Sequence, residues 1–600
     1  MSSSDTTLDD ASQAQSASDT EALAPPRGIG AGPELPGEPP GRGDIAGRYG
    51  RLGRRHGRIG TLGFMSCLVA VLFALPVASV LFNVFVPSEG AWGHLAETVL
   101  PNYVANTFWL VLGVGLGVLV IGTGTAWLVT MCSFPGRRLL EWALILPLAV
   151  PAYVMAYTYT DFLQFTGPVQ SLLREVTGWG PRAYWFPEIR SLGGAIAMLS
   201  LVLYPYVYLL SRATFMEQSI CALEVSRTLG CGAWGSFLRV ALPLARPGIA
   251  AGVALALMET LADFGTVSYF SVQTFTTGIY KAWFSMGDRV AAAQLSAVLL
   301  GFVAFVLLIE RLSRGRARFY NTTTKYQRLP DYPLRGWRAA GVIAACTLPV
   351  ALGFVLPAAI LLHMSLDLDV SPFTGRFMDL ALNSFTLAAI TSALAVTLAL
   401  MMAYGLRLNP HRAIATANRA AGLGYAVPGS VIAVGVLIPM ALFDNALDSW
   451  ARAALGVSTG LIFTGTIVAL IYAYLVRFLA VSLNTVEASL GKVKPSMDDA
   501  ARNLGEGPVG TLTKVHAPLM WGSLLTAALV VFVDVMKELP ATLIMRPFNF
   551  DTLAVQAHNL AADERLAEAS APALAIVAVG VLPVIVLSRA IARSRPGGPR

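Results

Sequence analysis

The sequence predicts an all-α polytopic membrane protein with about 12 transmembrane helices in two homologous six-span halves. Three observations predict this: a composition poor in charge, a series of long apolar stretches, and short motifs that recur at a nearly constant spacing. The 600 residues are 55% hydrophobic and 13% charged, with a mean hydropathy of +0.61. Soluble domains carry about 25% charged residues. This composition disfavours a soluble enzyme, a disordered scaffold and a nucleic-acid binder.

Apolar stretches long enough to cross a membrane recur along the chain. A bilayer core about 30 Å thick needs roughly 20 apolar residues as a helix, because a helix satisfies its own backbone hydrogen bonds in lipid. The fifth and eleventh stretches are distinctive because each carries acidic residues at one end. The predicted spans are 62–86, 104–130, 140–163, 192–211, 247–264, 291–310, 339–363, 381–406, 420–443, 460–480, 522–542 and 571–588.

The spans divide the chain into two halves, 61–311 and 339–590, joined by a basic cytoplasmic linker, 312–338. Residues 1–60 are rich in Ser, Asp, Gly and Pro and end in an arginine cluster, which predicts a disordered cytoplasmic tail with a basic anchor. A secretory signal is not expected, because no short apolar core lies near the N-terminus. Residues 591–600 form a C-terminal tail.

The distribution of basic residues predicts the orientation of the chain. If the tail is cytoplasmic and the chain crosses twelve times, 33 of the 43 Lys and Arg fall on inside segments. This bias follows the positive-inside rule and puts both termini in the cytoplasm. The net charge of +7 is therefore mainly an orientation signal, with attraction to anionic membrane lipid as a secondary effect.

Cysteine and histidine follow no pattern of metal ligands or of catalytic residues. The five cysteines form no C-x-x-C pair, and the six histidines show no H-E-x-x-H spacing. No set of nucleophile and base is evident either, so an intramembrane enzyme is not supported. The sequence leaves any metal-binding residue unknown.

Motifs in the first half recur in the second. Asn106-Thr107-Phe108 returns as Asn383-Ser384-Phe385, and Val150-Pro151 returns as Val427-Pro428, both at an offset of 277. The loop E-V-S-R-T-L-G at 224–230 returns as D-A-A-R-N-L-G at 499–505, at an offset of 275. Six spans per unit preserve the orientation, so the halves should be related by an axis along the membrane normal.

The repeated loops predict a short helix–turn–helix in each half. Gly230 and Gly505 stand where a helix can end with positive φ. Pro243 and Pro518 then open the next span, where a missing N–H costs least. Two matching loops on one side of the membrane suggest a surface that docks a two-fold symmetric partner.

These loops resemble the E-A-A-x-x-x-G-x9-I-x-L-P signature of ABC importer permeases, with Val225-Ser226 and Asp499 among the modest departures. The resemblance implies the type I ABC importer transmembrane fold. It also implies that loops 217–243 and 492–518 carry coupling helices for an ATPase subunit. The implied coupling residues are Glu224, Arg227, Gly230 and Pro243 in the first loop, and Asp499, Arg502, Gly505 and Pro518 in the second.

The chain carries no G-x-x-x-x-G-K-[ST] motif, so this chain is not expected to be an enzyme or to bind a cofactor. ATP and Mg²⁺ should bind to a separate ABC ATPase, present as two copies to meet two loops. The resemblance adds a periplasmic or lipid-anchored substrate-binding protein as a partner. It places the chain in the bacterial cytoplasmic (inner) membrane as a multi-pass protein.

Acidic residues at the ends of the fifth and eleventh spans are candidates for the translocation pathway. Glu259 matches Asp534 and Asp263 matches Glu538 at the 275 offset. Each i, i+4 pair should place two carboxylates on one helical face, with Lys537 as a partner of Asp534. The alternative is that these groups sit in water, cap the following loop, or pair with Lys537.

Several strings resemble the fused ferric-iron (Fe3+) ABC permeases, including E-T-L-A-D-F-G-T-V at 259–267 and D-V-M-K-E-L-P-A-T-L at 534–543. The resemblance favours Fe(III) as cargo, whereas related permeases carry thiamine, polyamines, sulfate or phosphonates. Tyr153 and Tyr157 suit ferric ligation chemically, but an aromatic belt explains them more simply. An ion-driven secondary transporter with twelve spans is a further alternative, which would need no ATPase dock.

Overall fold

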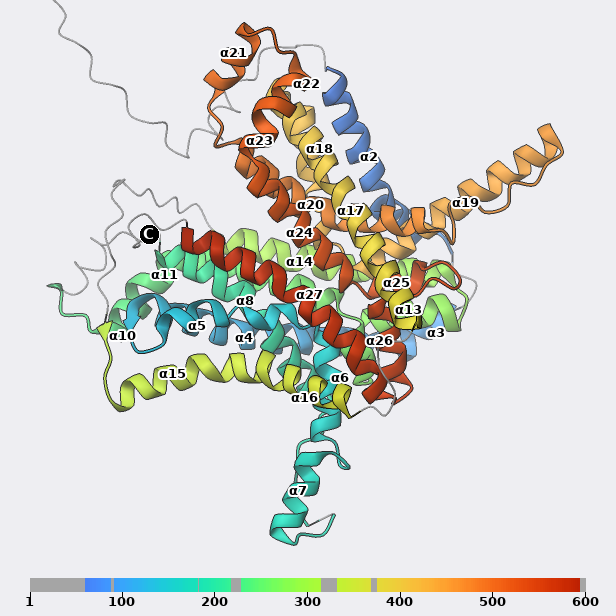
Figure 1. Ribbon diagram of the computed structural model, residues 1–600. Helices are drawn as coiled ribbons and strands as arrows, with labels where there is room; N and C mark the ends of the chain where they lie inside the picture. The colour runs from blue at the N-terminus through green and yellow to red at the C-terminus, as the bar shows by residue number, and fades with distance from the viewer. Residues whose placement is uncertain are drawn as a thin grey trace, which may run out of the picture. The chain divides into compact units, whose positions relative to one another are not determined.

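A computed structural model describes residues 60–87, 91–181, 183–216, 228–314, 332–367 and 375–593 (Figure 1). Within these residues ten helices are long and apolar enough to cross a membrane, and two further spans consist of sharply bent helix pairs. The predicted all-α membrane fold is therefore confirmed, with ten candidate spans among the described residues and twelve if each bent pair crosses once. The tail 1–59, most of the linker at 315–331, and residues 594–600 lie outside the described residues.

The described part of the first half, up to residue 314, contains twelve α-helices, and 3-10 or π segments extend some of them. They are α2 (Thr61–Phe82), α3 (Ala91–Thr98), α4 (Leu100–Met131), α5 (Arg137–Ala143), α6 (Ala152–Leu163), α7 (Pro168–Thr177), α8 (Leu192–Met216), α11 (Leu242–Ala262), α13 (Phe275–Tyr280) and α14 (Arg289–Arg314), with the short helices α10 (Ala233–Ser236) and α12 (Gly265–Tyr269) between them. The strand β1 (Cys132–Ser133) pairs in parallel with β2 (Tyr332–Pro333) near the end of the linker.

The second half repeats this order within its described residues. It contains α15 (Trp337–Val350), α16 (Leu356–Leu366), α17 (Gly375–Leu408), α18 (Arg412–Ala421), α19 (Gly429–Leu455), α20 (Ile467–Leu490), α21 (Pro495–Asn503), α22 (Pro508–Thr511), α23 (Ala517–Leu519), α24 (Trp521–Met536), α25 (Pro540–Met545), α26 (Leu553–Ala562) and α27 (Leu566–Arg593).

Three spans differ from their predicted form, two of them at a Val-Pro pair. In the third span the helical segments on either side of Val150-Pro151 are bent by 91°, because a residue before proline avoids the helical conformation. The equivalent Val427-Pro428 starts α19 at Gly429, nine residues later than predicted, and α19 then runs on to Leu455. The eleventh span is bent by 80° between its two helical parts and ends at Met536.

The internal repeat is visible in the contacts of equivalent side chains. The amide of Asn106 donates to the carbonyl of Gln273 at 2.9 Å, and the amide of Asn383 donates to the carbonyl of Asp551 at 3.1 Å. Both halves also widen into a five-residue π-helix at the same place, Phe237–Ala241 and Leu512–His516. Because π segments are rare, their recurrence supports a duplicated unit.

The first helix of each half packs against the other half. Helix α2 contacts α17, α18 and α19 of the second half, and Figure 1 shows it beside α17 and α18. Helix α15 contacts α4 and α5, and α16 contacts α6 and α27. The two halves are therefore interlocked within one hydrophobic core.

Candidate functional site

A small cavity of about 110 Å³ lies between the two halves and is lined by six charged side chains. The carboxylates are Glu259 and Asp263 from the first half and Asp534 and Glu538 from the second; the cations are Arg477 and Lys537, both from the second half. With all six ionised, this charged cavity carries a net charge of −2. Such charges at membrane depth mark a functional site by default.

The helices end between the two carboxylates of each predicted pair. Helix α11 ends at Ala262 and α24 at Met536, so Asp263 and Glu538 lie beyond the helices and the prediction of one helical face was wrong. These two carboxylates instead accept hydrogen bonds at the start of the next helix. Asp263 accepts from the Val267 N–H at 3.1 Å and from the Thr266 hydroxyl at 3.0 Å.

Glu538 plays the equivalent part in the second half. It accepts from the N–H groups of Ala541 and Thr542, at 3.0 and 3.1 Å, and from the Thr542 hydroxyl at 2.8 Å. For Asp263 and Glu538, the alternative that acidic groups cap the following segment therefore holds. All four carboxylates nevertheless line the same cavity.

Arg477 on α20 is the central group that the sequence reasoning missed. Its guanidinium lies 3.2 Å from Glu538 Oε1 and 3.5 Å from Glu259 Oε2, so it joins a carboxylate of each half. Only 6% of its surface is exposed. Arg477 was among the 33 basic residues assigned to inside segments, although it lies within the predicted span 460–480, three residues before its end. An arginine inside an apolar span was the available signal.

Two further contacts close the charged cavity. Lys537 Nζ lies 2.9 Å from Asp534 Oδ1, which confirms the predicted i, i+3 partnership. The hydroxyls of Tyr206 and Tyr425, one from each half, are 3.5 Å apart. Both of these tyrosines also line a second cavity, so the two hydroxyls stand between the two spaces.

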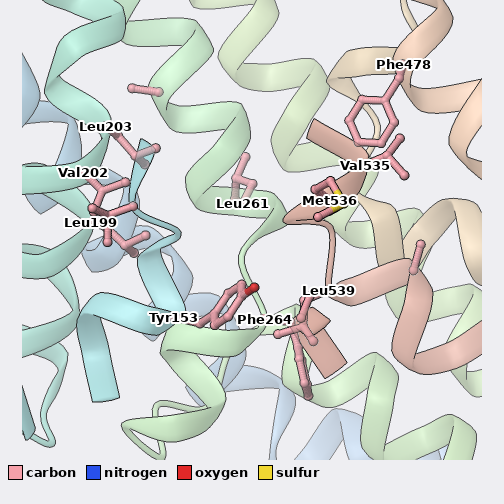
Figure 2. Close-up of a cluster of buried hydrophobic side chains, with 14 of the residues drawn as sticks. Tyr153, Leu199, Val202, Leu203, Leu261, Phe264, Phe478, Val535, Met536 and Leu539 are labelled. Carbon is pink, nitrogen blue, oxygen red and sulfur yellow. The ribbon is translucent and has the colours of Figure 1, made fainter. Parts of the chain in front are cut away.

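Apolar side chains from equivalent positions of the two halves surround the charged groups. Leu261 and Phe264 of the first half correspond to Met536 and Leu539 of the second at the 275 offset, and all four are buried. Figure 2 shows them gathered with Tyr153 around the ends of α11 and α24. Of these four, Phe264 and Leu539 line the charged cavity, so the duplication supplies an equivalent apolar wall residue from each half.

The predicted aromatic belt was wrong for the first tyrosine cluster. Tyr153, Tyr157 and Tyr159 are each at most 5% exposed and lie inside the protein. Tyr157 hydrogen-bonds to His558 Nδ1 at 3.1 Å, and burial lowers the pKa of His558 to about 4. Tyr153 lines the charged cavity with a buried hydroxyl that has no hydrogen-bond partner.

The second cavity is larger, about 460 Å³, and mostly apolar. Its lining includes Met258 on α11, Asn484 on α20 and Val530 on α24. Along each of these helices the lining residues lie nearer to the repeated loops than the charged cavity does. The space between the halves therefore widens toward the loops and narrows at the charged cavity.

Among the residues that the structure describes, no three His, Cys, Asp or Glu side chains are grouped closely enough to hold a metal ion. The caps made by Asp263 and Glu538, and the ion pairs of Glu259 and Asp534, occupy the carboxylates in this state. The charged cavity is accordingly a set of paired charges and not a preformed metal site.

The second repeated loop forms the predicted helix–turn–helix. Helix α21 ends before Gly505, which has φ +83°, and α22 follows. Asp499 and Arg502 are exposed on α21, and Pro518 lies in α23. Arg407 on α17 binds Asp498 of α21 at 2.8 Å and also donates to the carbonyls of Leu490 and Val493, so it anchors the loop.

In the first repeated loop, Glu224 and Arg227 lie outside the described residues. Gly230 has φ +81°, matching Gly505, and Pro243 stands at the start of α11. The predicted positive φ is thus confirmed at both glycines. Leu229 and Leu504, which precede them, are both exposed large apolar side chains, as a docking surface requires.

The duplicated all-α membrane fold and its two matching loops are those of a permease of the ABC importer class. Residues 119–318 match the family described as binding-protein-dependent transport system inner membrane component, and the chain belongs to that family. It is the permease subunit of an ABC importer and a multi-pass protein of the inner membrane. The relatives below are proteins to which it is similar.

The chain is 25% identical to the Fe(3+)-transport system permease protein FbpB 2 of Haemophilus influenzae over 545 residues, which cover 88% of this chain and 98% of the relative. It is 30% identical to the molybdenum transport system permease protein ModB of Escherichia coli over 212 residues, 33% of this chain and 88% of the relative. It is 26% identical to the sulfate transport system permease protein CysT of Escherichia coli, over 43% of this chain and 92% of the relative.

Proposed function

We propose that this permease passes Fe(III), delivered by an external binding protein, across the cytoplasmic membrane by alternating access. The observation that carries the proposal is the match to a permease named for Fe(3+) that runs along 88% of this chain and therefore spans both halves. The charged cavity adds chemical support, since its net charge is negative and its carboxylate oxygens suit a hard cation.

The same cavity argues against an oxyanion cargo such as sulfate or molybdate. An oxyanion needs cations that can bind it, but Arg477 and Lys537 are each committed to carboxylates at 3.5 Å or less. Four carboxylates would also repel an incoming anion in a site of low dielectric. Polyamine and thiamine are cationic and remain alternatives that uptake assays must separate.

Two copies of a separate ABC ATPase should dock on the loops 217–243 and 492–518, which contain Gly230 and Gly505. In support, both glycines adopt positive φ at equivalent positions and an exposed leucine precedes each of them. ATP-driven closure of the ATPase pair would press on both loops, and the interlocked halves would rock about the charged cavity. In this proposal both termini and both loops face the cytoplasm.

The test is uptake by the reconstituted complex in proteoliposomes. ATP hydrolysis and uptake of radioactive ⁵⁵Fe are measured with a binding protein loaded with Fe(III). In parallel, ATP hydrolysis and uptake of the labelled cargo are measured with binding proteins loaded with molybdate, sulfate or a polyamine. Fe(III) should stimulate both signals. Stimulation by another cargo alone would refute the Fe(III) assignment, and transport without a copurifying ATPase would favour the ion-driven alternative.

A charge-neutralised variant tests the pathway itself. Glu259→Gln, Asp263→Asn, Asp534→Asn and Glu538→Gln together remove the four carboxylates from the cavity. We expect uptake to be lost while the ATPase still copurifies. If uptake and ATPase stimulation both survived, the pathway role of these residues would be abandoned.

A further inference from the structure

The ion pairs of the charged cavity differ in which halves they join. Arg477 and Glu538 both belong to the second half, as do Lys537 and Asp534. Only the contact between Arg477 and Glu259, at 3.5 Å, crosses from one half to the other. It is therefore the one of these three charge pairs that a separation of the halves must break.

The contacts also decide which partner Arg477 keeps. Glu538 is held in place by three hydrogen bonds from Ala541 and Thr542, and its side chain is almost fully buried. Glu259 is more exposed, and its contact with Arg477 is the longer of the two. When the halves part, Arg477 should stay with Glu538, and the carboxylate of Glu259 should become free.

We propose that Arg477 is a tethered cation that latches the two halves together at the charged cavity, and that Glu259, once released, receives the cationic cargo. The proposal rests on the proposed import function and adds the residue that closes the pathway and the residue that receives the cation. In the open state the second half would present two internally neutralised pairs. The first half would present Glu259 and Asp263, with a net charge of −2.

One unpartnered polar atom supports a site for a cation here. The hydroxyl of Tyr153, a first-half residue that is 5% exposed, lines the charged cavity and makes no hydrogen bond. Figure 2 shows Tyr153 in the same buried apolar cluster as Phe264 and Leu539. A buried hydroxyl without a partner costs free energy unless another state satisfies it.

The test compares Arg477→Gln with Glu259→Gln, because both remove the link between the halves but only the second removes the receiving carboxylate. Spin labels at Gln273→Cys and Phe548→Cys, two exposed positions with one in each half, report the distance between the halves. The five native cysteines are replaced by alanine in this background. The full chain is measured alone in nanodiscs, and then with its ATPase in proteoliposomes.

We expect both variants to shift the label distances toward longer values and to raise ATP hydrolysis without cargo by at least about fivefold, the lower end of typical coupling between sites. Uptake should be lost only in Glu259→Gln. The control is Arg452→Gln, which breaks an Arg–Asp ion pair on α19 that does not line either cavity. The control should leave both readouts unchanged.

A folded Arg477→Gln protein with the wild-type distance distribution and wild-type ATP hydrolysis would overturn the latch. Normal uptake by Glu259→Gln would overturn the receiving role. Both outcomes are distinct from a failure of the Fe(III) assignment, because the label distances are measured without cargo. If the wild-type complex ignored Fe(III) but Arg477→Gln still lengthened the distances, the latch would stand and the cargo would be wrong.

Discussion

Gly429 should be required for the latch, because no side chain fits at its position. It begins α19, and an added Cβ would lie 2.5 Å from Glu538 Oε1 and 2.9 Å from the Arg477 Nη1 atom. Ordinary contact begins near 3.4 Å, so in Gly429→Ala the carboxylate oxygen must move by about 0.9 Å. The hydrogen bond between Arg477 and Glu538, now 3.2 Å long, would then be lost or distorted.

The size of the effect follows from the cost of overpacking. Inserting a methyl group into a packed site typically costs about 1–3 kcal/mol. This strain exists in the open state too, because Gly429, Glu538 and Arg477 all belong to the second half. The states differ in the contact between Arg477 and Glu259, which is already 3.5 Å long and exists only while the halves are closed. A guanidinium displaced by the added Cβ should lose that contact, which should shift the balance from closed to open by about 5–150-fold, the typical range of coupling between sites. ATP hydrolysis without cargo should rise in Gly429→Ala, and the distance between labels at 273 and 548 should lengthen.

The matched control is Gly301→Ala in α14, where an added Cβ meets nothing within 4 Å. This change should leave the label distances and ATP hydrolysis at wild-type values. If Gly429→Ala behaved like Gly301→Ala in both assays, the close approach of Gly429 would not be what positions Arg477 for its contact with Glu259.

Three further predictions concern the loops and the outer helices. Gly230→Val together with Gly505→Val should abolish coupling while the membrane helices stay inserted, since a β-branched residue at φ near +80° costs at least about 1–2 kcal/mol per site. Uptake measures the coupling, and circular dichroism measures the helix content. Arg407→Gln should destabilise the second loop by about 3 kcal/mol and weaken copurification of the ATPase, because it removes the guanidinium 2.8 Å from Asp498 and leaves that carboxylate only the imidazole of His516. Lowering the pH from 6.5 to 4 should lower the apparent melting temperature, because His558 takes up a proton in the unfolded chain at a higher pH than in the folded protein. The loss in the free energy of unfolding reaches about 3 kcal/mol near pH 4.

Each of these predictions has its own control. Normal ATP-driven uptake in the double glycine variant would refute the coupling assignment of the loops. Arg502→Gln removes an exposed arginine from the same helix as Asp498 and should change stability by less than about 1 kcal/mol. In His558→Gln this part of the pH dependence should disappear; an unchanged pH profile would mean that other groups cause it.

The spans were predictable because each is a local property of the sequence. A run of about twenty apolar residues matches the thickness of a bilayer core, so each span can be recognised without its neighbours. The orientation that the charge bias predicts stays a prediction. The bend of the third span and the late start of α19 were less visible, although Val150-Pro151 and Val427-Pro428 mark both places. The repeat had shown these prolines as equivalent positions, but not that they break the helices.

The charged cavity was only partly predictable, because it depends on where helices end. Glu259, Asp263, Asp534 and Glu538 do line one cavity, but the early ends of α11 and α24 turn two of them into caps. Those ends are set by tertiary packing, since neither Ala262 nor Met536 is a strong stop signal. Arg477 matches Val202 in the first half, so the repeat could not point to it.

The unequal origin of the two cations gives the fusion of the halves an electrostatic meaning. Two copies of the first half would bring four carboxylates and no cation, a charge of −4, whereas two copies of the second half would balance to zero. The first arrangement would hold a cation too tightly to release it, and the second would not attract one. A single chain that carries one of each half fixes the intermediate value of −2. Binding strong enough to admit an ion yet weak enough to let it leave is what permeation requires.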